Sequence, residues 1–264
     1  GLNVDAASLR LDMKQVQARK DKVVTTLTKG VEFLFRKNKV DWIKGTARLA
    51  GGLKIEVAGE QPQTLVARKE IVVATGSQPR SVPGVEIDRK RIITSDEAIG
   101  LREVPKSIVV LGAGAVGVEF ASLFRTYGAE VTIVELLPRL VPVEDEAVSA
   151  DLQKAFRKRG IKTFTGSRVT SAQASESGVS LEVQTGDGKT EKMQADYLLV
   201  ATGRGPVTEG LGVKEAGLRL ERGYIVVDEY YRTGVPGISA VGDVITFEKP
   251  GHPQLAHVST AEGI

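Results

Sequence analysis

Hydrophobic residues in the first part of the chain recur at steps of three and four positions, which places them on one side of a helix over residues 10–38. Lysine and arginine residues occupy the other side, and we interpret them as a solvated face rather than a basic binding patch. After the helix, short apolar runs alternate with glycines over residues 40–57, which predicts antiparallel strands joined by a turn. The apolar helical positions are Val16, Val23, Val24, Leu27, Val31, Leu34 and Phe35.

Two continuous apolar runs further along end in the same three residues. They are "IVVATGS" at Ile71–Ser77 and "LLVATGR" at Leu198–Arg204. Such runs are typical of strands buried on both faces of a sheet, and their near-identity favours a shared role over two ordinary turns. A third run, Ile238–Val241, is followed by Gly242 and Asp243. This Asp could bind sugar or ribityl hydroxyls or could simply be a turn residue, and the sequence leaves both open.

Between the two repeats lies the segment "KSIVVLGAGAVGVEFASLFRTYGAEVTIVELLPRLV", whose pattern predicts a strand, a glycine-rich turn, a helix and a second strand. The strands are Ile108–Leu111 and Val131–Val134. Gly112, Gly114 and Gly117 have the G-x-G-x-x-G spacing, in which the first glycine makes the turn, the second admits a pyrophosphate and the third allows close packing. A diphosphate would sit at the helix N-terminus. The helix positions expected to face inward are Val116, Phe120, Leu123 and Phe124.

Glu135 ends the second predicted strand, where a carboxylate can accept hydrogen bonds from the adenosine ribose. The same carboxylate would repel the 2′-phosphate of NADP, so we expect NAD as the ligand. Arg139 lies nearby, but we expect Pro138 to turn the chain before it. We place Glu119 in the first turn of the helix, where the dipole alone favours an acidic residue, and a cofactor contact stays equally open.

Composition limits the other possibilities. A chain of 264 residues with 41% hydrophobic and 26% charged residues fits about two globular domains. The net charge of +3 is small and mixed along the chain, which argues against nucleic acid as a partner. There are no cysteines, which excludes disulfides and thiolate metal sites within these residues. The two histidines, His252 and His257, argue against a zinc site as well, so we expect no metal. Residues 1–10 show no secretory pattern and no run is long enough for a membrane helix, so we expect a cytoplasmic protein.

The order of the motifs is more specific than any one of them. "ATGS", "GAGAVGVE" with its Glu135, "ATGR", "AVGD" and "QLAH" together resemble the flavin-dependent pyridine nucleotide–disulfide oxidoreductases, and most closely the dihydrolipoamide dehydrogenases. The resemblance runs from about Leu11 to Ile264. It implies an α/β fold in which a Rossmann-like NAD domain (81–205) is inserted in a partial FAD-binding domain (1–80 and 206–264). Both FAD and NAD are the implied cofactors.

The resemblance also implies site residues. A helix starting at Leu255 would direct its N-terminus toward the flavin, and the family's "GR-x-PN" form is altered here at Val207, which weakens the match at that position only. Residues matching NAD contacts are Gly112, Ala113, Gly114, Ala115, Val116, Gly117, Val118, Glu119, Glu135, Val169 and Gly203. Residues matching FAD contacts are Ala47, Thr75, Gly76, Ser77, Asp243, Gln254, Leu255, Ala256 and His257.

Several parts of the family pattern have no counterpart in the sequence. These are the first FAD glycine turn, the redox cysteine pair and the C-terminal interface domain with its His–Glu pair, so no catalytic residue is assigned. We therefore expect an internal fragment, inactive by itself, of a homodimeric enzyme that oxidises dihydrolipoamide on lipoyl domains of 2-oxo acid dehydrogenase complexes. The alternatives are a fragment of a soluble transhydrogenase or of a mercuric or glutathione reductase-like flavoprotein, and a non-enzymatic NAD-binding module.

Overall fold

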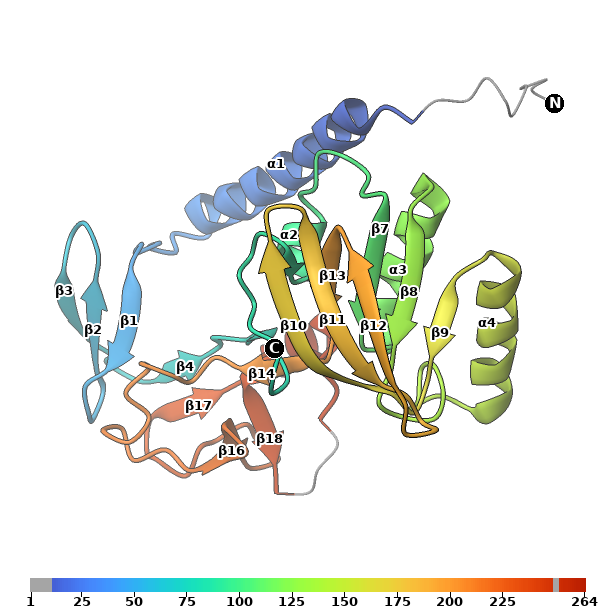
Figure 1. The fold of residues 1–264 in the computed structure, drawn as a ribbon. Helices are drawn as coiled ribbons and strands as arrows, with labels where there is room; N and C mark the ends of the chain where they lie inside the picture. The colour runs from blue at the N-terminus through green and yellow to red at the C-terminus, as the bar shows by residue number, and fades with distance from the viewer. Residues whose placement is uncertain (1–10, 249–251) are drawn as a thin grey trace. The chain divides into compact units, whose positions relative to one another are not determined.

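The computed structural model describes residues 11–248 and 252–264 (Figure 1). The chain divides into two compact units. Unit 1 contains the described residues through Leu34 together with Pro79–Gly203, and unit 2 contains Phe35–Gln78 together with Arg204–Ile264. The described residues before Leu34 thus group with the predicted NAD segment, whereas the sequence led us to place them in the FAD segment.

Unit 1 is built on a five-stranded parallel sheet with the order β6-β13-β7-β8-β9. Helices α3 (Ala115–Tyr127) and α4 (Glu146–Lys158) connect β7 to β8 and β8 to β9, as expected for right-handed crossovers. The strands of the sheet are β6 (Ile92–Ile93), β7 (Ser107–Leu111), β8 (Glu130–Val134), β9 (Lys162–Phe164) and β13 (Tyr197–Val200). The strand–turn–helix–strand prediction is confirmed.

Two layers cover this sheet. Alternate residues of β7 point to opposite faces, so Ile108 and Val110 pack against the helices, whereas Val109 and Leu111 pack against a second sheet. That second sheet is antiparallel, with the order β10-β11-β12, and the sequence did not lead us to expect it. It lies across the parallel sheet in Figure 1. Its strands are β10 (Arg168–Ser175), β11 (Gly178–Gln184) and β12 (Thr190–Ala195). A short helix, α2 (Ser95–Ala98), adds Ala98 to the helical side.

The inward face of α3 differs from the predicted one. Phe124 is buried and Phe120 packs against the core as expected, but Val116 and Leu123 are each 39% exposed. Gly117 and Ala121 lie on the buried face instead. The reason is that α3 lies close to the sheet, so small residues rather than branched ones occupy the contact.

Unit 2 has its own hydrophobic core, formed by short strands that come from both of its chain segments. β4 (Ile71–Val73) pairs in parallel with β17 (Ile238–Ala240), and β16 (Tyr224–Val227) pairs with β15 (Leu220–Glu221) and β18 (Ile245–Phe247). The predicted antiparallel strands are β1 (Thr46–Leu49) and β2 (Lys54–Ala58), joined by the unpredicted β3 (Gln63–Val66). The remaining elements are β5 (Ser77–Pro79), β14 (Arg204–Pro206), the 3₁₀ turn η2 (Gly242–Val244) and helix α5 (Ala256–Glu262).

Two apolar surfaces predicted from the sequence are less buried than expected. The long helix is confirmed as α1 (Met13–Lys37), but none of its residues is buried. The run ending in the first Ala-Thr-Gly forms β4, where Val72 is 57% exposed, so only the second run, in β13, is largely buried on both faces. β4 belongs to a two-stranded sheet with one covered side.

Candidate functional site

The glycine-rich turn connects β7 to α3 at the carboxyl end of the parallel sheet. A Cβ on Gly112 would lie 2.4 Å from the carbonyl oxygen of Ala201, and the residue has a φ of +103° that side chains disfavour. A Cβ on Gly117 would lie 2.0 Å from the carbonyl oxygen of Gly112. These two glycines are therefore required by packing, as the motif predicts.

Gly114 is different, because no atom lies within 4 Å of the place where its Cβ would be. It is the N-cap residue of α3 and no side chain caps the helix there. The amides of the first helical turn are thus left to an external acceptor, and the helix dipole favours an anion at that point. Open space beside an uncapped helix N-terminus fits a dinucleotide pyrophosphate.

The carboxylate of Glu135 lies against the backbone of this turn. The residue is 8% exposed, so it does not face the solvent. Its Oε2 accepts a hydrogen bond from the backbone N–H of Ala113 at 2.6 Å, and its Oε1 accepts one from Leu137 at 2.8 Å. Glu135 therefore shapes the glycine turn as well as ending β8. Each carboxylate oxygen has a further lone pair, which leaves capacity for a ribose hydroxyl.

Three other residues predicted near the nucleotide occupy unexpected places. Glu119 is the fifth residue of α3, not part of its first turn, and is exposed. Val169 is 1% exposed and belongs to the core beneath the second sheet, so its side chain does not reach the surface. The guanidinium of Arg139 contacts Glu146 at 2.6 Å and also donates to the carbonyl oxygens of Pro142 and Glu144.

The remaining residues matched to NAD contacts divide by exposure. Ala113 is fully buried and contributes only backbone to the turn. Val118 is half-buried and its N–H donates to the Gly114 carbonyl, while Ala115, Val116 and Gly203 are exposed.

The two Ala-Thr-Gly copies make equivalent contacts. The Thr75 hydroxyl donates to the carbonyl of Val207, four residues beyond the glycine of the second copy. The Thr202 hydroxyl donates to the carbonyl of Arg80, four residues beyond the glycine of the first copy. Both distances are 2.7 Å. The repeat thus has a structural role that each threonine performs inside its own unit, and Val207, where the family pattern is altered, still receives this bond.

A second polar cluster surrounds Asp243 in η2. The Ser77 hydroxyl donates to Asp243 Oδ2 at 2.6 Å, and Arg204 donates to both the hydroxyl and the carbonyl oxygen of Ser77. The Gln254 amide lies 3.4 Å from the Asp243 carbonyl. The structure therefore brings together Ser77, Asp243 and Gln254, which sequence reasoning had assigned to one ligand.

The other residues matched to FAD contacts are open or exposed in the structure. Gly76 has no atom within 4 Å of its would-be Cβ, so its surface is open to a ligand. Ala47 is exposed on β1, and Leu255, the N-cap residue of α5, is 47% exposed. Ala256 and His257 in the first turn of α5 are exposed. The described residues thus fit a flavin in part, through Gly76 and the Asp243 turn.

Sequence reasoning gave no role to three residues of this cluster. Arg204 directly follows the second Ala-Thr-Gly, and that position was the available signal. Glu262 is the last residue of α5, where an acidic side chain opposes the helix dipole unless it has another partner. His252 contacts Glu262, and nothing in its spacing indicated this.

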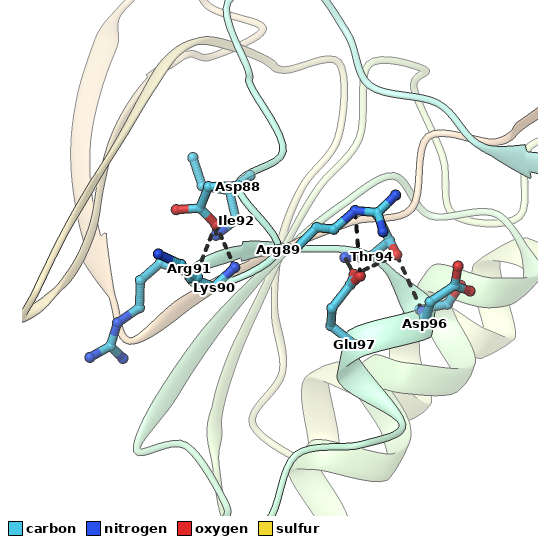
Figure 2. Close-up of polar contacts among 9 residues, drawn as sticks. Asp88, Arg89, Lys90, Arg91, Ile92, Thr94, Asp96 and Glu97 are labelled. Carbon is cyan, nitrogen blue, oxygen red and sulfur yellow. Dashed lines mark hydrogen bonds and ion pairs between the residues drawn. The ribbon is translucent and has the colours of Figure 1, made fainter. Parts of the chain in front are cut away.

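Figure 2 shows the polar contacts that hold the edge strand β6 of unit 1. Burial raises the pKa of the Asp88 carboxyl, but hydrogen bonds from the backbone N–H groups of Lys90, Arg91 and Ile92 outweigh it and hold the pKa below its usual value. Glu97 and Thr94 form a capping box at the start of α2. These contacts are structural.

The described part of the chain contains no helix long and apolar enough to cross a membrane. Nor do its side chains bring three or more histidine, aspartate or glutamate residues together as a metal site would need.

The fold is that of a two-unit α/β protein whose parallel sheet carries a Rossmann-like glycine turn. A sequence model described as pyridine nucleotide-disulphide oxidoreductase matches residues 4–263, and the chain belongs to that family. Members of the family use FAD and NAD(H), so the expected cofactor class is confirmed at the level of the family.

Named relatives agree with this assignment. Dihydrolipoyl dehydrogenase 3 of Pseudomonas putida is 45% identical over 96% of this chain and 54% of its own length. Dihydrolipoamide dehydrogenase of Chaetomium thermophilum is 40% identical over 99% of this chain and 52% of its own length. The crystal structure of LpdA from Mycobacterium tuberculosis superposes with a TM-score of 0.84 at 28% identity, covering 97% of this chain and 55% of LpdA. The chain thus spans about half the length of the curated relatives it matches.

Proposed function

We propose that unit 1 binds NAD at the turn Gly112–Gly117. The observation that carries the proposal is the contrast between packed Gly112 and Gly117 and open Gly114 at the uncapped start of α3. In this proposal the pyrophosphate accepts hydrogen bonds from the first-turn amides of α3, and Ala115, Val116 and Gly203 lie at the surface it would contact.

The preference for NAD over NADP rests on Glu135 and Arg139. The Glu135 carboxylate is held in place by two backbone N–H groups, so it cannot easily move away from a 2′-phosphate. Arg139, the nearby cation that could attract that phosphate, is engaged by Glu146 and two carbonyl oxygens. A fixed carboxylate and an occupied guanidinium both favour the ribose hydroxyls of NAD.

We assign the flavin side of the protein to unit 2. In this assignment Asp243 accepts hydrogen bonds from the ribityl hydroxyls or lies near the pyrophosphate, and Gly76 lets the cofactor approach the backbone. Gln254–His257 would lie beside the isoalloxazine, and Ala47 near the adenine end. FAD, when bound, would carry two electrons between a disulfide and the nicotinamide.

For the whole protein we propose dihydrolipoamide oxidation, on the strength of relatives with that name at 45% and 40% identity. The dithiol would lose two electrons and two protons to become a disulfide, while NAD⁺ takes up a hydride and a proton is released. These 264 residues contain no cysteine, so the redox pair would come from sequence outside them. Homodimer formation, lipoyl domains as partners and a cytoplasmic location stay predictions.

The test is a calorimetric titration of the purified chain with NAD⁺ and NADP⁺. We expect NAD⁺ to bind more tightly, and Glu135→Gln to narrow the difference because the amide removes the charge that repels the 2′-phosphate. The glutamine NH₂ also faces one of the two backbone donors, so NAD⁺ binding should weaken without being lost. The matched control is Glu191→Gln, at an exposed position of β12 in the same unit. Equal or tighter NADP⁺ binding by the unaltered chain would contradict the assignment of Glu135.

A second measurement addresses the whole-protein reaction. The chain by itself should reduce no NAD⁺ with dihydrolipoamide, because thiol–disulfide exchange requires a cysteine thiolate. Steady turnover by the isolated chain would refute the proposed mechanism.

A further inference from the structure

His252 and Glu262 form a buried pair in unit 2 that the proposed function does not use. Their side chains are 4% and 2% exposed, and His252 Nε2 lies 2.5 Å from Glu262 Oε1. The second carboxylate oxygen, Oε2, accepts a hydrogen bond from the backbone N–H of Gly242 at 2.6 Å. Glu262 therefore connects the histidine to the first residue of the turn that carries Asp243.

The chemistry of the pair fixes the direction of its hydrogen bonds. An ionised carboxylate only accepts, so Nε2 of His252 donates to Glu262. Nδ1, the other ring nitrogen, is buried and has no hydrogen-bond partner among the described residues. The imidazole packs against Phe247, with ring centroids 5.7 Å apart. Within the described part of the chain, Glu262 is the residue that His252 contacts through a polar atom, so His252 can act by orienting that carboxylate.

Glu262 in turn acts on the turn η2. Gly242 directly precedes Asp243, whose carboxylate accepts from Ser77 and whose carbonyl faces the Gln254 amide. The bond from Gly242 N–H to Glu262 is the contact that fixes this turn from the side of α5. Helix α5 itself gains nothing from an acidic residue at its C-terminal end.

We propose that His252 and Glu262 are positioning residues that hold η2 so that the Asp243 carboxylate is oriented toward a flavin ribityl or pyrophosphate group. The inference rests on the flavin part of the proposed function. His252 acts through Glu262, Glu262 acts through the Gly242 amide, and neither side chain touches the cofactor. Loss of the pair therefore weakens flavin binding without removing any flavin contact.

The experiment uses the full-length protein that carries this chain, with His252→Leu, His252→Gln and Glu262→Gln. Leucine keeps the apolar packing without a donor, whereas the glutamine amide can place an N–H near the position of Nε2. In Glu262→Gln the amide oxygen can still accept from Gly242, and its NH₂ can donate to the ring. Glu248→Ala is the matched control, because the polar contact that Glu248 makes with the described residues is an exposed ion pair with Arg219.

Two quantities are measured for each variant. The first is hydrogen–deuterium exchange of the peptide that contains Gly242, in protein stripped of flavin. The second is the dissociation constant for FAD, from flavin fluorescence. For His252→Leu we expect both the exchange rate and the FAD dissociation constant to rise about tenfold or more, the scale of one charge-assisted hydrogen bond. In His252→Gln and Glu262→Gln the exchange rate and the FAD dissociation constant should stay close to those of the unaltered protein. Glu248→Ala should change neither quantity.

Combining variants separates positioning from general stability. In an Asp243→Ala background, His252→Leu should change FAD affinity by less than about twofold, because the group being positioned is gone. Unchanged exchange at Gly242 in His252→Leu would overturn the proposal, and so would faster exchange with unchanged FAD affinity. If His252→Leu does not fold, Glu262→Ala replaces it. An exchange rate at Gly242 in that variant equal to the rate in the unaltered protein would also overturn the proposal. An unaltered protein that binds no FAD refutes the flavin assignment instead, and the exchange data then still decide whether the pair holds the turn.

Discussion

The turn at Gly112–Gly117 in unit 1 and the turn at Gly242–Val244 in unit 2 both place an acidic residue beside backbone amides, but different contacts hold that residue in each turn. In unit 1 the backbone amides at the start of α3 stay open and the acidic residue, Glu135, is held by two backbone N–H groups. In unit 2 the turn's first amide is taken by Glu262 and the acidic residue, Asp243, is held by one hydroxyl.

The comparison shows where each turn gets its geometry. The first is shaped by close backbone packing, within the stretch from β7 through Glu135 and against the carbonyl oxygen of Ala201. The second depends on side chains from segments far apart in the chain, since Ser77 and Asp243 are separated by 166 positions. We therefore expect the unit 1 turn to respond sharply to added side-chain volume, and the unit 2 turn to respond gradually to loss of hydrogen bonds.

The largest effect should follow Gly117→Ala. A Cβ there would lie 2.0 Å from the Gly112 carbonyl oxygen, so α3 must move away from β7. We expect a loss of about 3 kcal/mol or more in the stability of unit 1, at the upper end for overpacking. Thermal unfolding followed by circular dichroism measures it. A melting temperature within a degree of the unaltered chain would show that the two backbones are not in close contact.

Gly114→Val should separate folding from binding in the same turn. A Cβ at this position would meet no atom within 4 Å and leaves room for a larger side chain, so stability should be nearly unchanged. The branched side chain would occupy the place of the pyrophosphate, and NAD⁺ affinity should fall by about a hundredfold or more, roughly the loss of several charge-assisted hydrogen bonds. Calorimetric titration with NAD⁺ tests this, and unchanged affinity in the folded variant would place the site elsewhere.

Ser77→Ala should produce a smaller, graded effect in unit 2. It removes the hydroxyl that donates to Asp243 and accepts from Arg204, but both charged groups stay half-buried with access to water. We expect a cost of about 1–2 kcal/mol, typical of a hydrogen bond to a charged group. Urea unfolding followed by the fluorescence of Trp42, which lies in unit 2, measures it, with Thr246→Ala as the control. A larger loss of stability in Ser77→Ala than in Gly117→Ala would contradict the comparison, because the turn of unit 2 would then be the more sensitive of the two.

The smallest effect concerns the edge strand of unit 1. Burial raises the pKa of Glu97, but hydrogen bonds from the N–H and hydroxyl of Thr94 lower it by more than burial raises it. The folded-state pKa therefore lies below the usual value. A depressed pKa contributes stability that is present above the unfolded-state value and is lost as pH falls through the folded one. We expect Thr94→Ala to cost about 1 kcal/mol at neutral pH and less below about pH 4. Melting temperatures at both pH values test this, and an equal cost at each would contradict the role of the ionised carboxylate.

The sequence by itself determined the unit 1 turn. Strand β7, the three glycines, α3, β8 and Glu135 are contiguous, and each leaves a local signal: a continuous apolar run, fixed glycine spacing, a helical period and a charge at a strand end. Strands β1 and β2 were predicted for the same reason, because they are neighbours in the chain and are joined by a turn that contains glycines. It did not reveal the β10–β12 sheet, whose place over the parallel sheet depends on packing between strands distant in the chain.

Only the tertiary structure decided how the acidic groups are held. Nothing in the residues around Glu135 indicates that its carboxylate is buried against Ala113 and Leu137. The bonds from Ser77 to Asp243 and from Arg204 to Ser77 span 166 and 127 positions. Such contacts have no period or spacing in the sequence, because they join the two segments of unit 2, which also meet where β4 pairs with β17.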